Sequence, residues 1–476
     1  MESFISMRLV ISLLLLLTLN AAADVKDSIV KIYTVSKIPN YSIPWNSSIR
    51  RSNGSGSIIL GNRILTNAHV VANETFIEVK RHGDTKRYEA KVEFISHQAD
   101  LALLSVVDEK FFKGTKSLEF GDLPHIQQEL TVYGFPMGGN SISASTGIVS
   151  RIEHTRYVHS REIFLAIQID AAVNPGNSGG PAISEGKIIG VVMQEIPKSQ
   201  SIGYLVPTEI IKHFLDDIED GAYNGFIHLG IGTQKMQNMA LRSVYKMDED
   251  ITGVMVMDIS KNSSVHKVLK MGDILLRVDG HQINNDGSVE FEDDMFTSYM
   301  YYIDKKQRNE SVKFSILRDA EVMEIELVLQ NIADDDLLVN TVEHDIMPRY
   351  FIYGGYVFTP LSRNLLMRSR STLLKLRDAA SKWATQEQEE VVILLKVLAD
   401  KSNQGDHSFS LWMVDKVDEK GFKNFEEFKE LVLESKEKYV MLENSDGVKV
   451  AIDKNLAQEV EEEILKRYSI KSSLSE

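Results

Sequence analysis

Short apolar runs, spaced evenly along residues 25–206, constrain the fold more than any other feature of this chain. The runs are often β-branched, and Gly, Asn and Pro separate them. Many short strands in succession favour a β-barrel or a β-sandwich. Pro207 and Thr208 then open an amphipathic helix that Gly221 ends, so we expect a mainly β first domain over residues 24–222. The strand-like runs are Ser57–Leu60, Phe76–Lys80, Leu101–Val107, Leu130–Tyr133, Phe164–Ile169 and Lys187–Met193.

Two smaller units with mixed strand and helix patterns follow this domain. The first, residues 225–332, contains Gly272–Gly280, which is typical of a strand that enters a tight turn. The acidic stretch Asp334–Asp336 predicts a linker, and a second unit over residues 342–476 ends in an amphipathic helix near Asn455–Tyr468. Both patterns are compatible with diverged copies of one α+β module.

The charge and the composition exclude several classes of partner and site. A formal net charge of −15 argues against nucleic acid and anionic lipid as main partners, because both would be repelled. Cysteine is absent, which excludes disulfides, thiolate nucleophiles and cysteine-ligated metals. The histidines lack the spacing of metal ligands, so we expect neither a metal nor a cofactor.

The N-terminus has the pattern of a signal peptide over residues 1–23. Arg8 is followed by an apolar run, Leu9–Leu19, and then by a small-residue cleavage site at Ala21–Ala23. The run is short for a membrane span, although an uncleaved anchor is the alternative. We therefore expect an exported protein, periplasmic or secreted, with no stable membrane span after cleavage.

Three segments carry the residue types of nucleophilic catalysis. They are Thr66–Val71 with His69, Ala99–Leu104 with Asp100, and Asn174–Pro181 with Ser178; each borders a strand-like run. A serine hydroxyl needs an imidazole to take its proton, and a carboxylate orients that imidazole. The order His, Asp, Ser is the one used by chymotrypsin-fold enzymes. We therefore predict a catalytic triad of His69, Asp100 and Ser178, with His97 as a weaker alternative base.

The glycines around Ser178 suit an oxyanion hole. The tetrahedral intermediate of acyl transfer needs inward-pointing backbone N–H donors. A tightly curled loop over Gly176, Asn177 and Ser178 supplies them, with the N–H groups of Gly176 and Ser178 as the expected pair. Taken alone, this segment is also compatible with an ordinary glycine turn.

Together these segments, with Gly54–Ser57 before the His69 segment, resemble the HtrA/Deg (Do-like) family of trypsin-fold serine proteases. The resemblance implies a chymotrypsin-like double β-barrel with the active site between the barrels, followed by two PDZ-like α+β domains. It also implies a homo-oligomer built from trimers. The arrangement is similar to plant-type Deg members, in which the second PDZ domain is divergent.

The resemblance extends to a peptide-binding loop in residues 225–332. His228, Leu229, Gly230 and Ile231 resemble the loop with which a PDZ domain captures a terminal carboxylate while the peptide adds as a strand. Tyr353–Phe358 is a candidate second loop, but the insert through Arg377–Glu390 speaks against peptide binding there.

In the trypsin fold, Ala172, six residues before Ser178, lies at the base of the S1 pocket, and Gly203 is expected to line it. The pocket should accept small or medium apolar side chains.

The resulting hypothesis is an exported, ATP-independent serine endopeptidase that degrades unfolded or damaged proteins in stress-related quality control. Unfolded polypeptides and peptide C-termini are its expected partners. One alternative is a chaperone or peptide-binding scaffold with weak or conditional protease activity; another is an esterase on the same fold.

Tyr33, Tyr41 and Trp45 precede the barrel core. They are candidates for a subunit interface, or else they pack on their own barrel.

Overall fold

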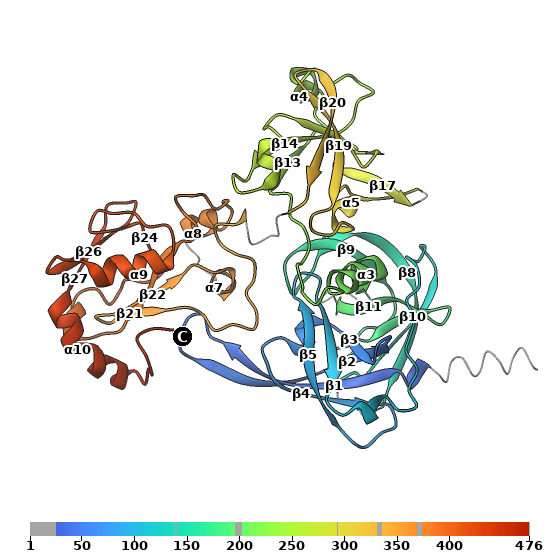
Figure 1. The fold of residues 1–476 in the computed structure, drawn as a ribbon, viewed down its shortest axis with the longest axis horizontal. Coiled ribbons are helices and arrows are strands. Elements are labelled where there is room, and N and C mark those ends of the chain that lie inside the picture. Colours follow the sequence, from blue (N-terminus) through green and yellow to red (C-terminus); the bar gives the residue numbers. More distant parts are fainter. Residues whose placement is uncertain are drawn as a thin grey trace, which may run out of the picture.

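The computed structural model describes residues 25–137, 139, 141–195, 202–292, 294–330, 336–368 and 374–475. A pair of β-barrels is followed by two smaller domains, which lie on two sides of that pair (Figure 1). The expected signal segment, residues 1–23, lies outside the described residues. Within the described ranges, no helix combines the length and the apolar composition needed to cross a bilayer.

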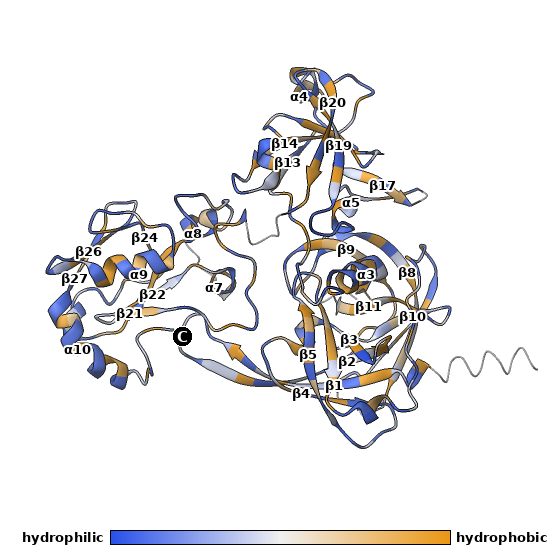
Figure 2. Ribbon diagram, viewed as in Figure 1, coloured by the Kyte–Doolittle hydropathy of each residue, from blue (hydrophilic) through white to orange (hydrophobic). Residues whose placement is uncertain are grey.

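The first barrel closes in the strand order β1-β2-β3-β6-β5-β4. Apolar side chains such as Ile32, Ile64, Val79 and Leu104 fill its interior with no exposed surface. Hydrophobic and hydrophilic residues alternate along several barrel strands (Figure 2), as expected when one face of a strand lies in a core. The elements are β1 (Ile29–Pro39), β2 (Ser47–Ile59), β3 (Arg63–Thr66), α2 (Ala68–Val71), β4 (Glu74–Arg81), β5 (Tyr88–Ser96), β6 (Leu101–Val106) and the 3-10 turn η1 (Glu109–Phe112).

The second barrel closes in the order β10-β11-β12-β9-β8-β7, and helix α3 (Thr208–Asp217) follows it. One apolar cluster joins both barrels and the helix, since it contains Leu103, Val191 and Phe214. The mainly β class and the chymotrypsin-like double barrel are therefore confirmed. The strands are β7 (Glu129–Gly134), β8 (Ser143–Arg156), β9 (Ile163–Ile169), β10 (Pro181–Ser184), β11 (Lys187–Glu195) and β12 (Gly203–Pro207).

The first small domain is a sheet in the order β13-β14-β15-β19-β20, with β16 paired to β15. It is docked on the second barrel: Tyr301 joins that barrel's core, and His154 Nε2 lies 3.0 Å from Asp304 Oδ2 in a nearly buried pair. Its elements are β13 (Ile231–Lys235), α4 (Met239–Val244), β14 (Val254–Ile259), η2 (Ser264–Lys267), β15 (Ile274–Val278), β16 (His281–Gln282), β17 (Ser288–Glu292), β18 (Met295–Ser298), α5 (Tyr301–Asp304), β19 (Ser311–Arg318) and β20 (Glu321–Val328).

The second small domain has two sheets, β21-β22-β23-β24 and β25-β26-β27, which two amphipathic helices cover. The last of them, α10, agrees with the final helix expected near Asn455–Tyr468. Its elements are β21 (Phe351–Tyr353), β22 (Tyr356–Pro360), α7 (Arg363–Arg368), α8 (Leu374–Ala379), β23 (Val392–Val397), η3 (Lys401–Asn403), β24 (Trp412–Val414), β25 (Lys416–Val417), α9 (Phe425–Glu434), β26 (Tyr439–Glu443), β27 (Lys449–Asp453) and α10 (Lys454–Arg467).

The long β1–β2 hairpin corrects one expectation from the sequence. Its tip reaches the second small domain (Figure 1), where Tyr41 is buried in that domain's core and Trp45 packs edge-on against Tyr350. Tyr33 instead lies under the Arg87 guanidinium, 3.7 Å from its ring centre. Tyr41 and Trp45 are therefore neither a free interface nor packed on their own barrel, because they hold two domains of one chain together.

Candidate active site

His69 and Asp100 form the best-defined polar pair between the barrels. His69 lies in the short helix α2, directly after β3, and Asp100 lies in the turn between β5 and β6. His69 Nδ1 is 2.7 Å from Asp100 Oδ2, and the His69 backbone N–H donates to Asp100 Oδ1 at 2.9 Å. Asp100 has a positive φ of 55°, which Asp and Asn tolerate better than most residues. Asn67 Nδ2 donates to the Asp100 carbonyl at 2.8 Å and so fixes the turn.

The environment of this pair favours an imidazole that accepts a proton readily. Burial alone would lower the pKa of His69, but the charge and hydrogen bond of Asp100 raise that pKa above its ordinary value of 6.5. Burial alone would raise the pKa of Asp100, but His69 holds it below its ordinary value. The Asp100 side chain is 1% exposed and that of His69 is 32% exposed, so the carboxylate is shielded from water while the imidazole stays accessible to a substrate.

The loop that carries Ser178 is pressed against the segment that carries His69. The Ser55 N–H donates to the Ser178 carbonyl at 2.8 Å. Gly179 has a φ of 83°, and a side chain there would collide with Thr66, three residues before His69. The Ser178 hydroxyl donates to the Met193 carbonyl at 3.5 Å, and within the described residues it has no hydrogen bond to His69. Catalytic hydrogen bonds are often long or misaligned in unliganded enzymes.

Two backbone N–H groups beside Ser178 are free to receive an oxyanion. Gly176 has a φ of 102°, and its Cα packs against the Phe135–Met137 backbone where no side chain fits. Within the part of the chain that the structure describes, the N–H groups of Gly176 and Ser178 donate to no protein acceptor. The Asn177 N–H, in contrast, donates to the Asn174 carbonyl at 3.0 Å. The available donors are therefore Gly176 and Ser178, and Asn177 serves the turn.

Only part of the expected S1 pocket lies in the described residues. Ala172 is exposed. Gly203 is buried at the start of β12, where an added side chain would collide with Val173. Residues 196–201, which precede Gly203 in the sequence, lie outside the described residues. The preference for small or medium apolar side chains therefore stays a prediction.

His159, which the sequence did not indicate, lies beside the candidate triad. Its ring centre is 6.1 Å from that of His69, and burial lowers its pKa to about 4. His97, the alternative base, bonds instead to His159 Nε2 (2.9 Å, through Nδ1) and to Asp345 (2.6 Å, through Nε2). These histidines come from segments far apart in the chain, so no spacing rule finds them.

The candidate carboxylate loop of the first small domain is already in contact with a carboxylate of the same chain. Gly230 has a φ of 64°, and a side chain there would meet Asp336 Oδ2 and Ser263. Asp336 is fully buried; its Oδ1 accepts from Ser260 Oγ at 2.7 Å, and its Oδ2 is 3.8 Å from His228 Nδ1. Asp336 was expected in a linker, but it is buried against this candidate loop.

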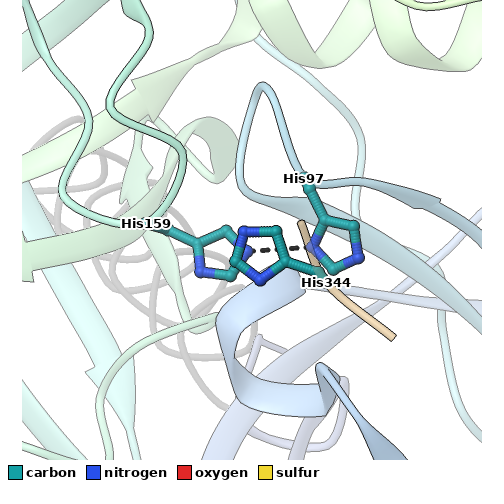
Figure 3. Close-up of side chains that lie close together, drawn as sticks. All are labelled: His97, His159 and His344. Carbon is teal, nitrogen blue, oxygen red and sulfur yellow. Dashed lines mark hydrogen bonds between the residues drawn. The ribbon is translucent and has the colours of Figure 1, made fainter. Parts of the chain in front are cut away.

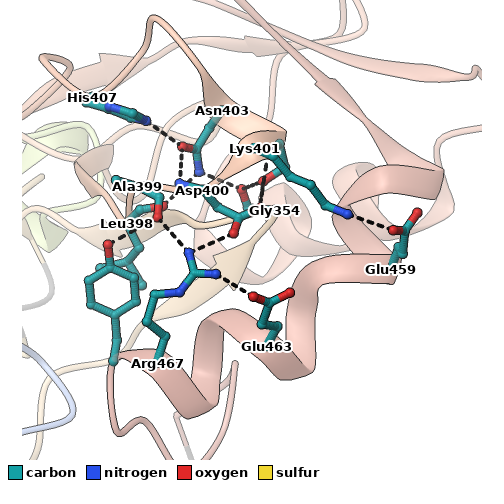
Figure 4. A network of polar contacts seen from close by, with 12 residues as sticks. Gly354, Leu398, Ala399, Asp400, Lys401, Asn403, His407, Glu459, Glu463 and Arg467 are labelled. Carbon is teal, nitrogen blue, oxygen red and sulfur yellow. Dashed lines mark hydrogen bonds and ion pairs between the residues drawn. The ribbon is translucent and has the colours of Figure 1, made fainter.

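The candidate second loop, Tyr353–Phe358, is a tight hairpin between β21 and β22. Gly354 and Gly355 have φ values of 56° and 88°, which suit a two-residue turn of the primed type. The Gly354 carbonyl accepts from Asn403 Nδ2 at 3.0 Å and from Ser402 Oγ at 3.1 Å (Figure 4). The turn is therefore filled by side chains of its own domain.

Comparisons with protein-family models agree with this layout. A trypsin-like peptidase domain matches residues 54–191, and PDZ domain models match residues 228–329 and residues 339–476. The three matches cover most of the double barrel, from within β2 to within β11, and nearly all of both small domains.

Relatives of known sequence are similar over almost the whole chain. The chain is 38% identical over 452 residues to a putative protease Do-like 3, mitochondrial, of Arabidopsis thaliana; the alignment spans 94% of this chain and 80% of the relative. It is 39% identical over 408 residues to protease Do-like 4, mitochondrial, of the same plant, spanning 85% and 76% of the two chains. Among solved structures, an HtrA-type protease AlgW with a decapeptide has the same fold, with a TM-score of 0.51 at 21% identity, over 66% of this chain and 98% of that one.

Proposed function

The chain belongs to the Do-like (HtrA/Deg) family of serine proteases and is a serine-type endopeptidase; from this premise we propose that His69, Asp100 and Ser178 are its catalytic triad. The observation that carries the proposal is the His69–Asp100 pair, in which the carboxylate is buried and the imidazole reaches solvent. Ser178 lies on the loop packed beside it, with two backbone N–H groups that donate to no acceptor among the described residues.

In the proposed mechanism, a bound polypeptide turns the Ser178 hydroxyl from the Met193 carbonyl toward His69. His69 takes the hydroxyl proton as Ser178 attacks the scissile carbonyl, and Asp100 stabilises the imidazolium that forms. The N–H groups of Gly176 and Ser178 receive the oxyanion. His69 then gives its proton to the leaving amine, and water releases the acyl group by the same route in reverse.

The proposed substrates are unfolded or damaged polypeptides, which the enzyme cleaves without ATP. Extended chains suit an active site between two barrels, and a PDZ domain docked on the second barrel offers a place to hold a chain end. A chain end held by the first PDZ domain raises the local concentration of the rest of that chain at the active site. Assembly from trimers would multiply this effect.

The N-terminal segment, residues 1–23, is proposed to direct the chain across a membrane and to be removed. Periplasmic or secretory export follows from its pattern, whereas the names of several relatives place those proteins in mitochondria or chloroplasts. N-terminal sequencing of the protein from its native source tests the proposal: a mature chain that begins at Asp24 supports cleavage, and one that retains Met1 contradicts it.

Degradation of unfolded casein tests the proposed activity. The purified mature chain should cleave casein without ATP, mainly after small or medium apolar residues, and the Ser178→Ala protein should leave it intact. Loss of casein aggregation without cleavage would favour the chaperone alternative. Cleavage mainly after Lys or Arg would contradict the proposed S1 preference.

A further inference from the structure

Three histidines from three distant segments meet beside the active site. His97 follows β5, His159 follows β8, and His344 lies in the segment that enters the second PDZ domain. His344 stacks on both of the other rings, with ring centres 4.2 Å from His97 and 4.0 Å from His159 (Figure 3). One nitrogen from each ring lies within 4.8 Å of the other two.

The hydrogen bonds of the cluster leave nitrogen lone pairs available. Asp345 Oδ2 lies 2.6 Å from His97 Nε2, so His97 donates there and its Nδ1 lone pair faces His159. His344 Nε2 is buried and has no hydrogen-bond partner within the described residues. A buried polar atom without a partner is costly, and here it belongs to a side chain that is a good metal ligand.

The spacing of the nitrogens is close to that of a metal site. His97 Nδ1 and His159 Nε2 are 2.9 Å apart. Two imidazole nitrogens on a tetrahedral Zn²⁺, with bonds of about 2.0–2.1 Å, lie about 3.3 Å apart. The two nitrogens would need to move apart by a few tenths of an ångström to bind the ion. His159 would also need to carry its proton on Nδ1, so that its Nε2 lone pair faces the ion. His344 then needs to turn out of its stack to bring Nε2 to the third position.

We propose that His97, His159 and His344 form a binding site for one divalent transition-metal ion of the Zn²⁺ class. Imidazole nitrogens suit Zn²⁺ and its neighbours and do not suit Mg²⁺ or Ca²⁺. Asp345 holds the far nitrogen of His97, the carboxylate–histidine arrangement that orients metal-binding imidazoles. Asp100 and Asp345 add negative charge around the site. His97 is partly exposed and, with His344, lines an open groove, which gives the ion a route from solvent.

The ion would tie two domains together. Two ligands belong to the protease barrels and the third to the segment that leads into the second PDZ domain, so the metal adds an inter-domain contact at the edge of the candidate active site. His159 is the ligand that lies beside His69. Ligand binding to the folded state raises apparent stability. Here the ion should stabilise the connecting segment that carries His344 as well as the barrels.

Isothermal titration of the full-length Ser178→Ala protein with Zn²⁺ tests the site without any dependence on proteolysis. One ion per chain should bind, and His344→Ala, which alters no barrel residue, should weaken binding by at least about 100-fold. Asp345→Asn should weaken it by about 10–100-fold, as expected when the partner of a ligand is removed. His125→Ala, an exposed histidine on the second barrel, should bind as the parent does.

Titration with Co²⁺ gives a second readout. The parent should develop the intense visible bands of a low-coordinate cobalt site, and His344→Ala should not. Binding that is equally tight in His344→Ala, or the absence of any binding at millimolar Zn²⁺, would overturn the proposal. Either result leaves the triad assignment untouched, because Ser178 takes no part in the measurement.

Discussion

The proposed catalytic centre and the candidate carboxylate loop of the first PDZ domain are both proposed to bind part of a polypeptide, but they differ in what lies against them. Beside Ser178, the N–H groups of Gly176 and Ser178 meet no acceptor in the described chain. At Gly230, the buried carboxylate of Asp336 lies against the loop. In the first region two backbone donors have no acceptor among the described residues, whereas in the second a carboxylate of the same chain lies against the loop. Changes in the first should therefore alter the rate strongly, and changes in the second should alter binding modestly.

Replacing His69 by Ala has the largest expected effect. The members of a Ser–His–Asp triad act as a unit, so loss of the base should lower kcat by about six orders of magnitude. Steady-state cleavage of a fluorogenic casein peptide measures this change. A variant at His97, His97→Ala, serves as the comparison, since it should retain most of the activity. If His97→Ala were the inactive variant and His69→Ala the active one, the base would be assigned wrongly.

Asp100→Asn should lower kcat by about 10⁴-fold, because the amide leaves the imidazole in the wrong tautomer. Asn tolerates the positive φ of this position, so the fold should be kept, and circular dichroism checks that.

The pH profile sharpens the same point. His69 acts as a base only when neutral, and Asp100 raises its pKa above 6.5, so kcat/KM of the parent should rise with pH through a midpoint above 6.5. In Asp100→Asn the midpoint should move to lower pH. An unchanged midpoint would mean that another carboxylate orients His69.

Gly176→Ala should lower kcat by about 10²–10³-fold, because the new side chain would lie 2.8 Å from Met137 N and must push the oxyanion donors out of place. Gly186→Ala is the matched control. Gly186 also has a positive φ, 79°, but has nothing within 4 Å. Gly186→Ala carries only the strain of the positive φ, so it should lose less thermal stability than Gly176→Ala and keep its turnover. Equal turnover in the two variants would remove Gly176 from the oxyanion hole.

Asp336→Asn has the smallest expected effect, a gain of about tenfold in the affinity of the first PDZ domain for a peptide with a free apolar C-terminus. If the Asp336 carboxylate competes with the peptide, the apparent affinity is reduced by the fraction of molecules in which the loop is free. Removing the charge of Asp336 should restore the full affinity. Fluorescence anisotropy with a labelled peptide measures it, and Asp250→Asn, an exposed acid of the same domain, is the control. Unchanged affinity would show that Asp336 does not compete.

The features that the sequence predicted well are those that local segments determine. The strands, helix α3 and the final helix follow from the spacing of apolar residues. The His69, Asp100 and Ser178 segments each border a strand; Asp100 contacts His69, and the Ser178 loop packs against Thr66, while their joint role as a triad stays a prediction.

The features that the sequence missed depend on contacts between distant segments. Asp336 has the surroundings of a linker in sequence but is buried against Gly230, about a hundred residues earlier. Tyr41 and Trp45 are residue types that are common at interfaces. The structure shows that the β1–β2 hairpin extends far enough for them to pack on the second PDZ domain. The histidine cluster likewise draws on three segments that no spacing rule relates. Such contacts are set by how domains dock, which local periodicity does not encode.

Labelling with a fluorophosphonate probe, followed by peptide mass spectrometry, tests the central claim most directly. The account predicts that the probe forms one adduct per chain, on Ser178, and that His69→Ala greatly slows its formation. Ser143→Ala, a serine of the same barrel, should be labelled as fast as the parent. An adduct on another residue, or undiminished labelling of Ser178→Ala, would contradict the assignment of Ser178 as the nucleophile.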